Sequence, residues 1–398
     1  MIVRLIYLLL FFLGENVSNL LGIELQNILY FFVVFGILAI VLNYSLFNLF
    51  INRKDEYYII LVIIVLFSFR FFSGILSDSV RSILVLFVTP ILFLLVPQNI
   101  DGVKTYNFKK FLMSLLFWFF VIECAIAVFE FFIKDHVFLW VNTTFDQISN
   151  SDGAFRSNSI HGAPLTNALL VTIVNSFIVI SNLKSKYKLF LWSLGFIAVL
   201  TFNARIAILL NSFILIFYFG RIFFSTKYSV NRKMIISIGV FIISLIFLYL
   251  ISSTNIGSRL FDRELFDQSS GEQRLAIFDI FDYYSIYSFF YGISMMEFNY
   301  IKDSFGLLII ENFWINILVL FGLVFLISLI FFYTRLVRRY LIFYSFKDSL
   351  IIVSVFLIIT SINNSLFTQF FPLLLYLVCL DLFRPIIFNR IVNKRWLS

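Results

Sequence analysis

Long apolar runs separated by short polar breaks fill most of this chain of 398 residues. A run of about 20 apolar residues is long enough to cross the hydrocarbon core of a bilayer as a helix. Hydrophobic residues make up 61% of the sequence and charged residues only 13%, a balance that excludes a soluble globular domain. We therefore expect an all-α, polytopic integral membrane protein.

The apolar runs predict about twelve spans, and ten or eleven also fit the pattern. Polar residues interrupt the first run, but it has no small-residue cleavage site of a signal peptide, so we interpret it as a span. Residues 1–398 then form a single membrane domain. The expected spans cover roughly residues 2–22, 28–51, 57–76, 80–97, 111–133, 162–182, 188–203, 205–224, 234–252, 307–332, 349–362 and 366–383.

Charge predicts the orientation of these spans. With the N-terminus inside, 21 of the 30 Lys and Arg residues fall on the cytoplasmic side, whereas 17 of the 22 acidic residues fall on the outer side. Positive charge is retained on the cytoplasmic side of membranes. We therefore expect both termini in the cytoplasm and the protein in the plasma (inner) membrane. The net charge of +8 lies in juxtamembrane clusters, which does not indicate nucleic-acid binding.

Two outer loops are long enough to carry a function. One covers residues 134–161, and the larger one covers residues 253–306 between the ninth and tenth spans. Within the larger loop, residues 272–286 space their apolar side chains as an amphipathic helix does. We expect this helix to lie on the membrane surface.

Arginine is concentrated among the basic residues of the outer side. Its planar guanidinium binds phosphate through paired N–H donors, so the pattern predicts an outward-facing site for a phosphorylated substrate. Nine basic residues lie on this side, namely Arg70, Arg81, Arg156, Arg205, Arg259, Arg263, Arg274, Lys134 and Lys302.

Three of these arginines are the strongest candidates for substrate binding. Arg156 and His161 belong to a polar turn that leads into a span, where unpaired backbone N–H groups can hold a phosphate; the alternative is an anchor to lipid headgroups. Arg205 lies in a tight outer hairpin, and its alternative is an ion pair with Glu123 or Glu130. Arg274 begins the amphipathic stretch, where surface ion pairing is the alternative.

Glu311 and Asn312 lie near the outer end of the tenth span. A carboxylate there can accept a proton from a sugar hydroxyl as a general base, and a structural ion pair is the alternative. The sequence contains no nucleotide-binding or zinc-binding motif, and its two histidines are too few for a typical metal site. We therefore expect neither a metal nor another cofactor.

Four segments, in this order, resemble the bacterial O-antigen polymerase and ligase superfamily. They are FRSNSIHGAPL (155–165), NARIA (203–207), EQRLAIFDIF (272–281) followed by Gly292, and ENFWINILVLFG (311–322). Ala204 stands where the family usually has Ser, and Glu311 stands where ligases have a catalytic histidine. This last difference favours a polymerase over a ligase.

The resemblance implies an enzyme that acts on oligosaccharide repeat units carried by undecaprenyl pyrophosphate. Arg156, Arg205 and Arg274 would bind the pyrophosphate with His161 and Asn312 nearby, and Glu311 would be the base. Membrane lipid, a repeat-unit flippase and a chain-length regulator are the implied partners, with an O-antigen or capsule as the product. A ligase and a transporter or lipid flippase remain the alternatives.

Overall fold

The computed structural model describes six segments of the chain and a few isolated positions. The segments are residues 14–22, 103–138, 155–225, 278–304, 312–361 and 371–385; the isolated positions are 62, 65, 90 and several between 229 and 249. Regular secondary structure in these segments is helical. The expected spans at 28–51, 57–76, 80–97 and most of 2–22 and 234–252 lie outside the described residues.

Three helices in the described segments are long and apolar enough to cross a membrane. They are α8 (Val103–Ile133, apolar from Tyr106), α12 (Arg205–Phe223) and α18 (Phe313–Leu341). Their length and composition agree with a membrane protein. The tenth span was expected at 307–332. Helix α18 begins at Phe313, where Asn312 caps its first turn, and it ends at Leu341, beyond the predicted span.

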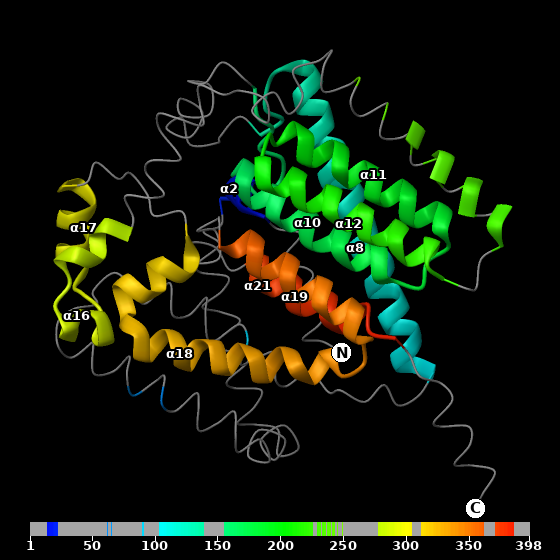
Figure 1. Ribbon diagram of the computed structural model, residues 1–398. Coiled ribbons are helices and arrows are strands. Elements are labelled where there is room, and N and C mark those ends of the chain that lie inside the picture. The colour runs from blue at the N-terminus through cyan, green and yellow to red at the C-terminus, as the bar shows by residue number, and fades with distance from the viewer. Residues whose placement is uncertain are drawn as a thin grey trace, which may run out of the picture.

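Helix α10 (Pro164–Ile180) occupies the centre of the bundle (Figure 1). It packs against α8, α11 (Ser185–Thr201), α12, α19 (Phe346–Thr360) and α21 (Phe371–Leu382). Nearly every residue of α10 is buried, on all sides of the helix. Helices α10, α11 and α12 begin and end within three residues of the predicted spans, because apolar runs and polar turns define them sharply.

A polar seam joins α10 to α12 within this apolar bundle. The Asn175 side-chain amide donates to the side-chain oxygen of Asn211 at 2.8 Å, and the Asn211 amide donates to the hydroxyl of Thr172 at 2.8 Å. All three side chains are fully buried. Helices in lipid gain little from apolar burial, so interhelical hydrogen bonds of this kind help to fix which helix faces which.

Basic residues gather at the end of the bundle that charge predicts to be cytoplasmic. The Lys109 ammonium donates to the carbonyl of Arg384 at 3.0 Å, which joins the start of α8 to the end of α21. Arg221 at the end of α12 forms an ion pair with Asp348 at the start of α19. These contacts bring predicted inner residues together, and the side that they face stays a prediction.

Helix α18 is broken at Gly322, whose backbone has φ 82° and ψ 171°. The break frees the carbonyl of Val319, which accepts a hydrogen bond from the N–H of Ile293 at 3.2 Å and one from the hydroxyl of Tyr284 at 3.4 Å. Both donors flank α16 (Ile286–Tyr291), and with α17 (Met295–Ser304) they lie beside the bent end of α18 (Figure 1). The irregular backbone is therefore satisfied by protein donors.

The amphipathic helix expected at 272–286 falls partly outside the described residues. From residue 278 onwards the segment contains η3 (Ile280–Tyr283), then leaves helical geometry at Tyr284 and Ser285. The Ser285 hydroxyl accepts the N–H of Ser288 at 3.0 Å and so caps a new helix, α16. The expected single helix is therefore divided, because the Ser285 cap starts a separate helix at Ile286.

Candidate functional site

The loop at residues 155–163 is packed against the end of the bundle that charge predicts to face outward. The N–H of Ser157 donates to the carbonyl of Thr201 at 3.2 Å, and the Ser157 hydroxyl donates to the carbonyl of Ala127 at 2.6 Å. These bonds attach the loop both to the end of α11 and to α8. The loop is therefore positioned by two helices rather than by its own turn.

Arg156 contacts the turn that precedes Arg205. The Nε–H of Arg156 donates to the carbonyl of Phe202 at 3.2 Å, three residues before Arg205 begins α12. The turn between α11 and α12 is short because Asn203 adopts a left-handed conformation with φ 54°, which asparagine tolerates better than most residues. Both arginines are partly buried, so their charges lie in a setting of reduced solvent screening.

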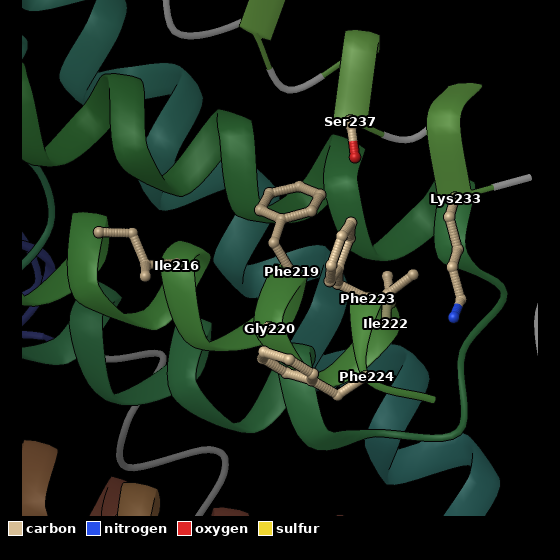
Figure 2. A pocket seen from close by; sticks show the side chains of 8 residues that line it. All are labelled: Ile216, Phe219, Gly220, Ile222, Phe223, Phe224, Lys233 and Ser237. Carbon is tan, nitrogen blue, oxygen red and sulfur yellow. The ribbon is translucent and has the colours of Figure 1, made fainter. Parts of the chain in front are cut away.

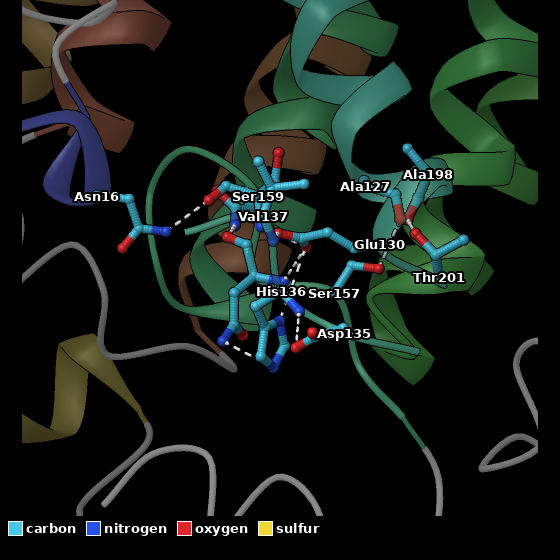
Figure 3. A network of polar contacts seen from close by, with 12 residues as sticks. Asn16, Ala127, Glu130, Asp135, His136, Val137, Ser157, Ser159, Ala198 and Thr201 are labelled. Carbon is cyan, nitrogen blue, oxygen red and sulfur yellow. Dashed lines mark hydrogen bonds and ion pairs between the residues drawn. The ribbon is translucent and has the colours of Figure 1, made fainter. Parts of the chain in front are cut away.

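The buried carboxylate of Glu130 accepts three backbone N–H groups. Its oxygens accept from Val137 at 3.0 Å, Asn158 at 2.8 Å and Ser159 at 2.9 Å (Figure 3). Such a cradle of N–H groups is a typical anion site. A phosphate was expected at the N–H groups where the following helix begins. The N–H groups of Asn158 and Ser159, earlier in the loop, hold the Glu130 side chain, and Arg156 and His161 stay the phosphate-binding candidates of the loop.

His136 lies next to the same carboxylate. Its Nδ1 lies 3.9 Å from Oε2 of Glu130, and its ring stacks on Phe155 with 5.0 Å between centroids. Lys134, next to this pair, extends its ammonium over the ring of Phe131 at 3.3 Å. Desolvation lowers the pKa of Lys134 below its ordinary value.

His161 pairs with the other glutamate of α8. Its Nδ1 lies 3.7 Å from a carboxylate oxygen of Glu123, both side chains are almost completely buried, and the His161 ring meets Phe119 edge-on. The side-chain amide of Asn16 in α2 (Glu15–Leu20) donates to the carbonyl of Ser159 at 2.6 Å, so α2 also holds the loop. In this arrangement His161 orients the loop.

The two glutamates of α8 were expected to be the alternative partners of Arg205. Within the described segments, the carboxylate of Glu123 faces His161 and that of Glu130 faces backbone N–H groups and His136. The structural ion pair proposed as an alternative role for Arg205 is therefore not formed with either residue.

Among the remaining predicted site residues, the structure describes Asn312. Asn312 caps α18, where its side-chain oxygen accepts the N–H of Ile315 at 3.1 Å, and no contact between it and Arg156 or Arg205 is described. Glu311 and Arg274 lie outside the described residues, as do the outer arginines at positions 70, 81, 259 and 263. Their roles stay predictions.

Sequence reasoning did not find the anchoring role of Glu130. Its position seven residues after Glu123 places both on one face of α8, but spacing indicates only a shared face and not the partner. The sequence signal for a paired glutamate is the presence of two acids in an apolar helix and of two histidines in the segment that follows it, since buried charges are usually paired.

Comparisons with known proteins add no relative. No protein-family model matches the chain, and a search of curated proteins finds no match. The class defined by the fold is an α-helical membrane protein with a polar loop and two arginines at one end of its bundle. A more specific function rests on the residues themselves.

Proposed function

We propose that the protein is a polymerase of a bacterial surface polysaccharide that acts at the outer face of the plasma membrane. It transfers a growing glycan from undecaprenyl pyrophosphate to the terminal sugar of the next lipid-linked repeat unit. The observation that carries the proposal is the contact of Arg156 with the turn that precedes Arg205, both arginines being partly buried at one end of the bundle. The resemblance of four sequence segments to the O-antigen polymerase superfamily supports it.

The reaction requires stabilisation of a pyrophosphate leaving group. A sugar hydroxyl of the acceptor attacks the anomeric carbon of the donor glycan, and the bond to the pyrophosphate oxygen breaks with its electron pair. The hydroxyl proton passes to a base, for which Glu311 is the candidate. Charge that builds on the phosphate is stabilised by arginines fixed in advance and poorly screened by water. Holding both lipid-linked substrates at one membrane depth supplies their orientation.

Replacing either arginine should abolish long polymer. We expect Arg156→Ala and Arg205→Ala to lower the rate of polymerisation by about 100-fold, as loss of one charge-stabilising donor does. The corresponding Lys variants should recover part of the activity, because Lys keeps the charge but loses the planar donor pair. The measurement is the length distribution of glycan made by purified protein from a lipid-linked repeat unit.

The control is Arg338→Ala, since Arg338 is exposed in the last turn of α18, at the other end of that helix from Asn312. It should leave polymer length unchanged. Normal long polymer from both outer variants, at normal protein amounts, would rule out the pyrophosphate clamp. Full activity of Glu311→Gln would remove that residue as the base.

The break in α18 at Gly322 supports a second candidate, a transporter or lipid flippase, because discontinuous helices often line transport sites. Glycan from a deletion strain separates the possibilities. Loss of a polymerase leaves single repeat units on the final acceptor, whereas loss of a flippase leaves them on the cytoplasmic face. Loss of a ligase instead leaves long polymer on its lipid carrier.

A further inference from the structure

A small apolar groove lies at the end of α12 that carries Arg221, far along the helix from Arg205. It has a volume of about 280 Å³ and is walled by Phe219, Phe223 and Phe224 (Figure 2). Lys233 and Ser237 contribute the polar part of its lining. Phe223 and Phe224 are 60% and 84% exposed, so much of this aromatic wall is uncovered.

Lys233 supplies a positive charge at the edge of the groove. In the sequence, residues 221–233 contain four basic residues and no acidic one. Arg221 is neutralised by Asp348, whereas the ammonium of Lys233 lies 6.0 Å from the ring centre of Phe223. A cation at the edge of an aromatic wall matches a ligand with a negative head and a hydrocarbon body.

The floor of the groove is open at Gly220. A Cβ built on this glycine meets no atom within 4 Å, although the residue is in the regular part of α12. The missing side chain therefore contributes free space between the aromatic residues. A larger residue would project into that space without distorting the helix.

We propose that this groove binds one anionic phospholipid of the leaflet at the basic end of the bundle. The phosphate lies at Lys233 and the hydroxyl of Ser237, and the upper part of an acyl chain lies on Phe219 and Phe223. Basic pockets between spans at this membrane depth are suited to acidic headgroups. The site is at the other end of α12 from the proposed polymerase site and does not depend on it.

Lipid titration with native mass spectrometry of the detergent-purified protein tests the proposal. Wild-type protein should bind phosphatidylglycerol more tightly than phosphatidylcholine. Lys233→Gln should weaken phosphatidylglycerol binding roughly fivefold, as expected for one lysine at a membrane surface, and leave phosphatidylcholine binding unchanged. Gly220→Leu should weaken both lipids, since leucine fills the groove.

Two matched variants serve as controls. Gly239→Leu adds the same side chain at another glycine with open space around its Cβ, and Lys186→Gln removes an exposed lysine from the start of α11. Both should bind lipid like the wild type. An unchanged phosphatidylglycerol affinity in Lys233→Gln or in Gly220→Leu overturns the site. Tighter binding of undecaprenyl phosphate than of phosphatidylglycerol, lost in the same two variants, overturns the choice of a phospholipid.

Discussion

Glu130→Ala should destabilise the protein strongly. The substitution leaves the buried N–H groups of Asn158 and Ser159 without their acceptor, whereas the N–H of Val137 belongs to an exposed residue and can bond to water instead. Each buried donor left unsatisfied costs about 1–3 kcal/mol, so the two together cost roughly 2–6 kcal/mol. This is a large part of the total stability of many proteins, about 5–15 kcal/mol. The measurement is the melting temperature of the detergent-solubilised protein.

Glu297 provides a matched comparison for Glu130. Its carboxylate also accepts a backbone N–H, that of Ser294 at 2.9 Å, but Glu297 is exposed at the start of α17. Water replaces the lost acceptor there, so Glu297→Ala should cost no more than about 1 kcal/mol. If both variants melt at the same temperature, Glu130 does not anchor the loop.

Gly322→Ala should separate α16 from α18. A Cβ at this position overlaps the carbonyl of Phe290 and lies 2.6 Å from the backbone nitrogen of Gly292, and neither backbone atom can move aside as a side-chain end can. The φ of 82° with ψ of 171° is moreover a conformation that only glycine adopts readily, and forcing another residue into it costs about 1–3 kcal/mol. Overpacking adds about 1–3 kcal/mol.

Two measurements test this prediction. The melting temperature should fall, and a cysteine introduced in place of Ile293, which is buried and keeps its backbone N–H, should react faster with a soluble thiol reagent in the Gly322→Ala background. Gly239→Ala is the control, because the Cβ has open space there and alanine favours a helix over glycine by about 1 kcal/mol. An equal response from the two alanine variants would show that α16 is not held at the break.

The sequence predicted the central helices well. The runs that became α10, α11 and α12 are apolar throughout and end at polar turns, so length and composition determine them. The tight hairpin before Arg205 was also expected, and the structure places it at residues 202–204. Arg156 and Arg205 were proposed for one site from separate motifs. The Nε–H of Arg156 donates to the carbonyl of Phe202, three residues before Arg205, and the shared site stays a prediction.

Tertiary contacts decided what the sequence did not reveal. The sequence around Gly322 does not distinguish a break from an ordinary helical glycine. The break depends on hydrogen bonds donated by Ile293 and Tyr284, about 30 residues earlier in the chain. The polar loop at 155–163 was expected to lead into a helix whose first N–H groups hold a ligand. The carboxylate of Glu130 in α8 accepts the N–H groups of Asn158 and Ser159 in this loop, and no local sequence pattern predicts that pairing.

The burial of α10 on all sides also bears on how the protein is made. The hydroxyls of Thr172 and Ser176 donate to carbonyls within α10, but the side-chain amide of Asn175 finds its partner on α12, which is synthesised later. During synthesis α10 therefore has to stay near the insertion machinery, or near α8, until Asn211 arrives. The order of synthesis and the order of assembly are consequently different for this helix.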